Sequence, residues 1–126
     1  MLNHITFDSK AEADYYLLLL AKQQAGEIKS FRTQPKYLLQ ERFSKDGHTI
    51  RPIEYIADFE IEYADGRVEV VDVKGMETEG FKIKRKLFDY RYPHLKLTRM
   101  RFVKKFGGWI THEEWVQEKR KEAKTQ

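Results

Sequence analysis

The amino-acid sequence predicts a single α/β domain in which helices flank a mixed β-sheet, in the order α-β-β-β-α-β-α. Two observations support this fold class. Hydrophobic and polar residues alternate over residues 53–63, the two-residue period of a strand with one buried face. Residues 79–92 repeat their apolar side chains with the period of an amphipathic helix. A chain of 126 residues is long enough for one core of this kind but too short for two.

The N-terminal part of the chain is predicted to contain one helix and two short strands. Ser9 and Glu12 have the spacing of a capping box, which predicts a helix that begins here and ends before Gly26. Residues 28–31 and 36–40 are candidate strands, so the order allows one additional strand. The polar segment that follows, up to residue 52, is predicted to be a loop or the tip of a hairpin.

A hairpin is predicted in the middle of the chain. Residues 53–63 form its first strand, and Asp65-Gly66 is a turn sequence that leads into a second strand over residues 68–74. Gly75 ends this second strand.

The C-terminal half is predicted to continue with a helix over residues 79–92 and a strand over residues 96–104. Gly107-Gly108 predicts a turn, and residues 111–114 form a second capping box that begins a final helix. The polar sequence from about residue 118 predicts that the end of this helix is frayed.

The composition excludes several classes of protein and of site. Charged residues make up 35% of the chain and hydrophobic residues 40%, which is typical of a globular domain. No segment approaches the roughly 20 apolar residues that span a bilayer, and the N-terminus lacks a signal-peptide pattern, so we expect a cytoplasmic protein. The absence of cysteine excludes disulfides, thiol nucleophiles and zinc sites with thiolate ligands.

Basic residues are concentrated in one segment. Residues 82–105 contain ten lysines and arginines and a single acid, whereas the whole chain has a net charge of only +4, so the rest of the chain is acidic. This asymmetry predicts a surface that attracts nucleic acid, although an ordinary solvated basic surface is the alternative. The candidate DNA-binding residues are Lys82, Arg85, Lys86, Arg99, Arg101, Lys104 and Lys105.

Asp72 and Lys74 are candidates for a catalytic pair. They lie two residues apart in the predicted strand, which places both side chains on one face, about 7 Å apart. At the open end of a sheet, this pair can hold a divalent cation and orient or activate its water. Mg²⁺ and Mn²⁺ share a preference for oxygen ligands, so a few carboxylates suffice to bind them. The alternative is an ordinary surface ion pair.

Asp58 is a candidate second carboxylate, because it lies on the partner strand of the same hairpin. A two-residue loop, Asp65-Gly66, would place Asp58 and Asp72 on opposite faces. A three-residue loop, which adds Ala64 and puts Gly66 in the left-handed conformation, would pair Asp58 directly with Asp72. An active site therefore requires the longer loop or an equivalent bulge; the alternative is that Asp58 faces solvent.

Glu12 is a candidate third carboxylate. It occupies the third position of the first helix, where capping alone explains it, but its angular position falls within the apolar stripe of that helix. We therefore expect it to point toward the sheet. On the helix over residues 79–92, Lys84 projects from an apolar arc that consists of Phe81, Ile83, Leu87, Phe88 and Tyr90. Lys84 can stabilise charge that develops on a phosphate, or it can extend to solvent.

These segments together resemble the small phage-associated, junction-resolvase-like proteins of the PD-(D/E)xK nuclease superfamily. The resemblance covers nearly the whole chain, and the motifs that carry it are Phe7-Asp8-Ser9-Lys10-Ala11-Glu12, Gly26-Glu27-Ile28, Gln34-Pro35, Tyr55-Ile56-Ala57-Asp58-Phe59, Asp72-Val73-Lys74-Gly75 and Lys82-Ile83-Lys84-Arg85-Lys86-Leu87-Phe88. The layout is also similar to the nuclease subunit of some transposition systems.

The resemblance implies a restriction-endonuclease-like fold and a Mg²⁺- or Mn²⁺-dependent DNA endonuclease, with Lys74 beside the attacking water. The implied metal ligands are Glu12, Asp58, Asp72 and the carbonyl of Val73. Ala57 replaces the proline of the family motif, which affects the stiffness of the backbone and not the ligands. Related nucleases vary in the basic residue of the helix, so Lys86 is an alternative to Lys84.

The resemblance also implies a biological setting. It predicts cleavage of branched DNA, as in the resolution of Holliday junctions during phage recombination or replication, by a homodimer in the host cytoplasm. One alternative is a nucleic-acid-binding module without catalytic activity. Another is a nuclease subunit of a larger recombination or transposition complex.

Overall fold

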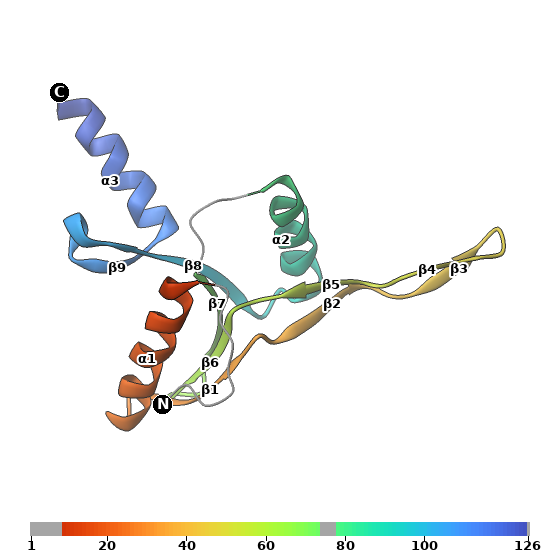
Figure 1. The fold of residues 1–126 in the computed structure, drawn as a ribbon, viewed down its shortest axis with the longest axis horizontal. Coiled ribbons are helices and arrows are strands. Elements are labelled where there is room, and N and C mark those ends of the chain that lie inside the picture. The colour runs from red at the N-terminus through yellow and green to blue at the C-terminus, as the bar shows by residue number, and fades with distance from the viewer. Residues whose placement is uncertain (1–8, 74–77, 126) are drawn as a thin grey trace.

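A five-stranded mixed sheet forms the centre of the protein, whose computed structural model describes residues 9–73 and 78–125 (Figure 1). The strand order is β1-β6-β7-β8-β9, and β7 and β8 form the parallel pair. The strands are β1 (Ile28–Thr33), β6 (Phe59–Tyr63), β7 (Val68–Val73), β8 (Lys96–Val103) and β9 (Gly108–Thr111). This arrangement confirms the predicted mixed sheet with helices.

Two helices cover the sheet on opposite faces, and each completes a separate core. Helix α1 (Lys10–Gln24) packs on one face, where its Tyr15 and Leu19 meet Phe59 and Val71. Helix α2 (Glu79–Arg91) packs on the other, where the buried residues are Tyr37, Leu39, Tyr55, Ala57, Val70, Phe88 and Leu97. Because neighbouring residues of a strand point to opposite faces, Val70 and Val71 contribute to different cores.

A long antiparallel ribbon connects β1 to β6 and extends away from the sheet (Figure 1). Its strands are β2 (Lys36–Gln40), β3 (Phe43–Lys45), β4 (His48–Ile50) and β5 (Ile53–Ile56), with β2 paired to β5 and β3 to β4. The predicted strand over 36–40 is confirmed, and the predicted hairpin tip is present, with Asp46 and Gly47 at positive φ in its turn. We call residues 36–56 the arm.

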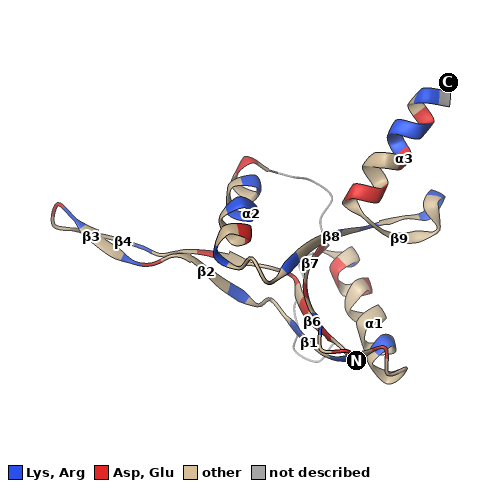
Figure 2. Cartoon of the chain, turned by 180° about the vertical axis from the view of Figure 1, so that it is seen from behind, with Lys and Arg blue, Asp and Glu red and all other residues tan. Residues whose placement is uncertain are grey.

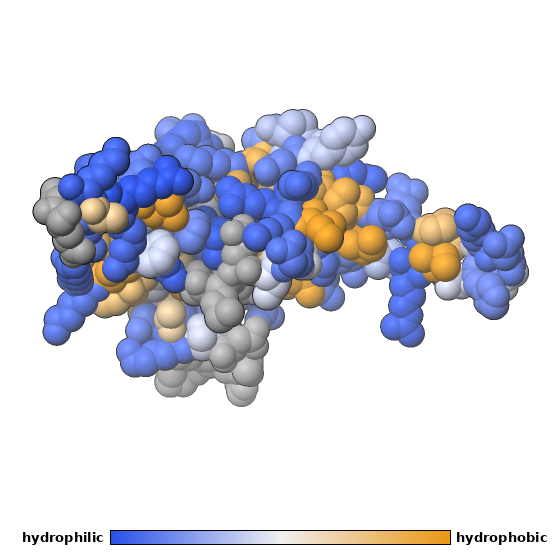
Figure 3. Space-filling view, turned by 90° about the horizontal axis from the view of Figure 1, so that it is seen from above, coloured by the Kyte–Doolittle hydropathy of each residue, from blue (hydrophilic) through white to orange (hydrophobic). Residues whose placement is uncertain are grey.

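The outer half of the arm has no core of its own. Every residue of β3 and β4 is exposed, and the paired Phe43 and Ile50 retain 43% and 38% of their surface. Figure 3 shows an apolar patch, coloured orange, near the end of the arm.

The predicted continuous strand over residues 53–63 is wrong, because the chain breaks between β5 and β6 at Ala57 and Asp58. Tyr55 belongs to the core under α2, whereas Phe59 belongs to the core under α1, although strict alternation would place them together. Backbone hydrogen bonds from Ala57 to Pro35 (3.1 Å) and from Gln34 to Asp58 (2.9 Å) hold the break in place. Alternate residues therefore point to one core before the break and to the other core after it, and Asp58, a candidate site residue, lies in the break.

The C-terminal part contains a strand that the sequence did not predict. Gly107 caps a short 3-10 helix, η1 (Lys104–Phe106), and Gly108 begins β9, so the two glycines turn the chain into an edge strand rather than directly into a helix. Helix α3 (His112–Thr125) follows and continues past residue 118. No helix among residues 9–73 and 78–125 is long and apolar enough to cross a membrane.

The predicted apolar arc of α2 is wrong in two positions. Ile83 and Tyr90 retain 59% and 83% of their surface, so they face solvent. The helix instead turns Phe81, Leu87 and Phe88 toward the core. The buried face therefore keeps three residues of the predicted arc and leaves out Ile83 and Tyr90.

Candidate active site

The β6–β7 hairpin has the register that a shared site requires. Phe59 pairs with Val71 and Glu62 with Val68, and continuation of this register places Asp58 opposite Asp72. The loop contains three residues, because the amide of Tyr63 donates to the carbonyl of Arg67 at 2.8 Å. Gly66 closes this loop at φ +92°, the left-handed conformation that glycine adopts without strain. Of the two loops that the sequence left open, the structure has the three-residue loop that an active site requires.

Asp72 is held at both carboxylate oxygens within the structure. Its Oδ1 accepts a hydrogen bond of 3.0 Å from the backbone amide of Asp58, and its Oδ2 accepts one from the hydroxyl of Tyr55. Asp72 has no exposed surface, and it lies one residue before the end of β7. Its carboxylate therefore occupies a fixed position where the strand approaches its carboxyl end.

Asp58 lies beside the same strand end. Its Oδ2 accepts a hydrogen bond of 2.7 Å from the backbone amide of Val73. The pKa of Asp58 is raised well above its ordinary value, first by burial and then by contact with the side chain of Glu12, and the charge of Asp72 adds to this effect. The amide of Val73 opposes the shift. Asp58 thus joins Asp72 and Glu12 in one electrostatic environment.

Glu12 faces the sheet, as predicted. It lies on the buried stripe of α1 with Tyr15 and Leu19, and its amide donates to the Ser9 hydroxyl at 3.1 Å, which confirms the capping interaction. The exposed fractions of Glu12, Asp58 and Asp72 are 3%, 6% and 0%. Isolated carboxylates of this depth are rare, because removing a charge from water is unfavourable unless a partner compensates it.

The donor chemistry of these residues suits a divalent cation. Carboxylate oxygens are the preferred ligands of Mg²⁺ and Mn²⁺, and the residue after Asp72, Val73, adds a backbone carbonyl at the strand end. Within the described residues, no three acidic or histidine side chains are close enough together to hold an ion in the present conformation. The predicted catalytic Lys74 lies outside the described residues.

Lys84 lies on the inward side of α2. It is three residues after Phe81 and four before the buried Phe88, and its side chain is half-buried. Lys86 is exposed. Of the two candidates, Lys84 is therefore the one on the helical face that turns toward the sheet.

The basic segment does not form one uninterrupted cationic surface. Lys82 pairs with Glu79 at 3.3 Å, Arg85 with Glu113 at 3.4 Å, and Lys105 with Glu122 at 2.5 Å. Figure 2 shows this mixture of signs along α2 and α3. Arg101 lies 4.0 Å from the centre of the Trp115 ring, and Lys86 and Lys104 are exposed.

Arg99 is not a surface residue, so its prediction as a DNA-binding residue on the basic surface is wrong. It is buried in β8, its Cα lies opposite Asp72 in the parallel register, and its guanidinium carbon lies 5.1 Å from the centre of the Phe81 ring. The high density of Lys and Arg in this segment suggested an exposed surface. However, β8 lies between β7 and β9 in the sheet, so one of its basic residues is buried. Arg99 instead brings a buried positive charge next to the strand position of Asp72.

Tyr55 is a site residue that sequence reasoning missed. It is one of several apolar residues that alternate in the same strand, and no pattern distinguishes it from them. Its contact with Asp72 depends on the break at Ala57 and Asp58, which the alternation does not reveal. Its pKa is raised above the ordinary range by burial and by the charge of Asp72.

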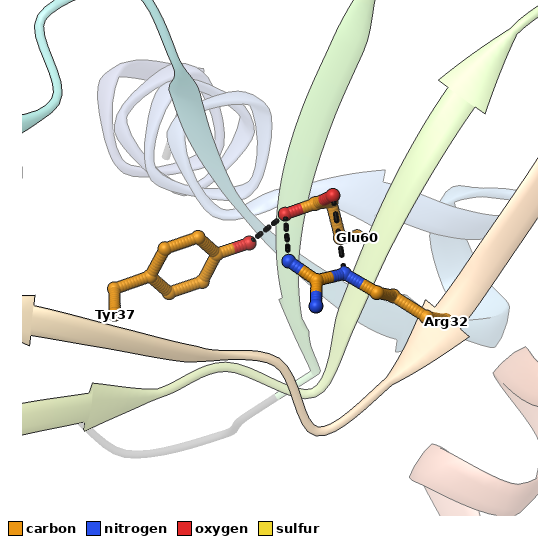
Figure 4. A network of polar contacts seen from close by, with 3 residues as sticks. All are labelled: Arg32, Tyr37 and Glu60. Atoms are coloured by element: carbon orange, nitrogen blue, oxygen red, sulfur yellow. Dashed lines mark hydrogen bonds and ion pairs between the residues drawn. The ribbon is translucent and has the colours of Figure 1, made fainter.

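A second polar network lies where the arm meets the sheet (Figure 4). Arg32 of β1 donates to both oxygens of Glu60, at 3.2 and 2.9 Å, and the hydroxyl of Tyr37 donates to the same carboxylate. The hydrogen bonds from Arg32 lower the pKa of Glu60. This network joins β1, β2 and β6 and does not include the three buried carboxylates.

Comparison with known families gives one match. Residues 1–108 match the family described as "Protein of unknown function (DUF1064)". The chain belongs to the DUF1064 family. The match includes Glu12, Asp58 and Asp72 and ends before α3. No curated protein and no solved structure matches the chain.

Proposed function

We propose that this DUF1064 protein is a metal-dependent DNA endonuclease with a restriction-endonuclease-like arrangement of its site. The observation that carries the proposal is that Asp58 contacts Glu12 and lies near Asp72, with all three carboxylates buried. An acidic residue such as Asp58, whose pKa is raised by burial and by neighbouring carboxylates, is common at functional sites. A purely structural role would favour apolar residues at these positions, because buried like charges destabilise a fold.

The chain's own residues have distinct roles in this proposal. Asp58, Asp72, Glu12 and the carbonyl of Val73 would hold Mg²⁺ or Mn²⁺. When bound, such an ion stabilises negative charge on a phosphate and lowers the pKa of a coordinated water. Lys74 follows directly in the chain and would orient the attacking water, and Lys84 would approach the phosphate from α2.

The proposed substrate is DNA, which exposed cations such as Lys86 and Lys104 would contact through its phosphates without reading sequence. Branched DNA, action as a homodimer and a place in phage recombination or replication follow from the resemblance to junction-resolving nucleases. They are parts of the same proposal. A cytoplasmic location is consistent with a DNA substrate.

The test is cleavage of plasmid DNA and of a four-way junction by the pure protein, with Mg²⁺ or with EDTA. We expect cleavage that requires Mg²⁺ and that disappears in Asp72→Asn. Glu62→Gln is the matched control, because it makes the same chemical change on the same hairpin, at a residue that pairs with Lys29 at 3.6 Å. DNA binding without cleavage would instead identify a non-catalytic binding module. Cleavage only after addition of a partner protein would identify a subunit of a larger complex.

A further inference from the structure

Two groups on one segment of chain hold the carboxylate of Asp72. The amide of Asp58 occupies one oxygen at 3.0 Å, and the hydroxyl of Tyr55 occupies the other. Each carboxylate oxygen can accept about two hydrogen bonds or ligand bonds. These two hydrogen bonds therefore set the orientation of the carboxylate within the fold.

Tyr55 has little freedom to move its hydroxyl. It pairs with Tyr37 across β2 and β5, and the two rings stack at 6.4 Å. Its ring also makes edge contacts with Phe81 at 6.2 Å and Phe88 at 5.7 Å, both from α2. Aromatic contacts on several sides fix the ring, so the hydroxyl reaches Asp72 from a preset direction.

We propose that Tyr55 is a positioning residue that orients Asp72 as a metal ligand. This inference rests on the proposed function, because it assumes that Asp72 binds a divalent cation. A hydrogen bond to a ligand carboxylate fixes its orientation, and the loss of such a partner typically weakens metal binding or activity by about 10- to 100-fold. The hydroxyl of Tyr55 thereby links the aromatic core beneath α2 to the candidate active site.

Tyr37 provides a matched control within the same core. It is buried next to Tyr55, it contacts Phe88 at 5.1 Å, and its hydroxyl also donates to a carboxylate. That carboxylate belongs to Glu60, which pairs with Arg32 and not with the candidate site. Tyr37→Phe and Tyr55→Phe therefore remove the same kind of bond from the same core, and only the second bond reaches Asp72.

The experiment compares Mn²⁺ binding by calorimetry for the wild type, Tyr55→Phe, Tyr37→Phe and Asp72→Asn. Thermal unfolding of the metal-free proteins and the Mg²⁺ concentration for half-maximal cleavage are measured in parallel. We expect Tyr55→Phe to raise the Kd for Mn²⁺ and the half-saturating Mg²⁺ concentration by about 10-fold or more. We expect Tyr37→Phe to keep the Kd for Mn²⁺ and the half-saturating Mg²⁺ concentration within about twofold of the wild type. Its change in Tm should be similar to that of Tyr55→Phe.

Three results would overturn the inference. Tyr55→Phe could bind Mn²⁺ like the wild type, in which case Asp72 does not need the hydroxyl. Tyr37→Phe could lose the same affinity, in which case the effect is a general loosening of the core. A wild type that binds no Mn²⁺ and cuts no DNA would remove the proposed function as well, whereas the first two results, in a wild type that binds and cuts, leave that function intact.

Discussion

The carboxylate of Asp58 accepts a hydrogen bond from the backbone amide of Val73 at 2.7 Å, just beyond the last paired residues of β6 and β7. The side chain of Asp58 thus continues the hydrogen bonding of the hairpin after the backbone of its own strand has turned away. The same carboxylate is buried against Glu12 and near Asp72. Asp58 therefore connects the end of the sheet to the candidate site, and its ionisation affects both.

The first prediction concerns stability and pH. Burial, and then contact with Glu12, raise the pKa of Asp58 above its ordinary value of 3.8, so the folded protein keeps a proton that the unfolded chain releases. The free energy of unfolding without metal should therefore fall as pH rises from about 4 toward 8, by at most about 1.4 kcal/mol per pH unit from this group. Urea titrations at several pH values measure the slope. Asp58→Asn should flatten it, and an unchanged slope in that variant would assign the effect to other groups.

The second prediction concerns metal and stability. A divalent cation favours ionised carboxylates, so Mg²⁺ should stabilise the protein more at pH 8 than at pH 5. At about 100 times the Kd, a ligand specific to the folded state adds about 2.7 kcal/mol to the free energy of unfolding. Thermal unfolding with Mg²⁺ or EDTA measures the shift in Tm. The shift should persist in Glu62→Gln and vanish in Asp72→Asn; an equal shift in both variants would place the ion elsewhere.

The pairing of Asp58 with Asp72 could be predicted only as a condition. Asp65-Gly66 identifies a turn but fits loops of two or three residues, and one residue of register moves the carboxylates to opposite faces. The structure supplies the missing information through the bond between Tyr63 and Arg67. The inward orientation of Glu12 could be predicted from the helical periodicity of its neighbours, because α1 packs on the sheet along a single stripe.

Other features depend on contacts between distant segments and leave no local signal. The alternation from Ile53 to Tyr63 continues through the break at Ala57 and Asp58, because each half is regular by itself and only the packing partner changes. Ile83 is apolar but exposed, since the face of α2 that packs on the aromatic residues of the arm carries Phe81 and Phe88. Burial of Arg99 likewise follows from the inner position of β8 and not from its neighbours in sequence.

The third prediction concerns the network at the base of the arm (Figure 4). Hydrogen bonds from Arg32 lower the pKa of Glu60, so the stabilisation that they supply is present above the ordinary pKa of 4.5 and is lost as pH falls below it. Because Arg32 is largely exposed, Arg32→Gln should reduce the free energy of unfolding at pH 7 by no more than about 1 kcal/mol. The same substitution should have a smaller effect at pH 3.

Urea unfolding of wild type and Arg32→Gln at the two pH values tests this prediction. Lys29→Gln is a suitable control, because Lys29 makes a longer ion pair, 3.6 Å, with Glu62 on the same pair of strands. An equal loss for Arg32→Gln at both pH values would show that its contribution comes from packing of the side chain and not from the charge of Glu60.

The fourth prediction concerns the loop that sets the register of the site. Gly66 has a φ of +92°, and a Cβ added there would meet no atom within 4 Å, so Gly66→Ala would be strained by its backbone conformation and not by a clash. We expect the free energy of unfolding to fall by about 1 kcal/mol or more.

Gly80 in the first turn of α2 is the opposite case, since its φ is ordinary and an added Cβ would lie 3.9 Å from the Thr78 hydroxyl. Gly80→Ala should stabilise the protein by up to about 1 kcal/mol.

Because Asp58 faces Asp72 only while the loop keeps three residues, Gly66→Ala should also weaken Mn²⁺ binding if the strain is relieved by a shift of register. Unchanged Mn²⁺ affinity with lowered stability would show that the hairpin keeps its register and that the loop accepts the strain.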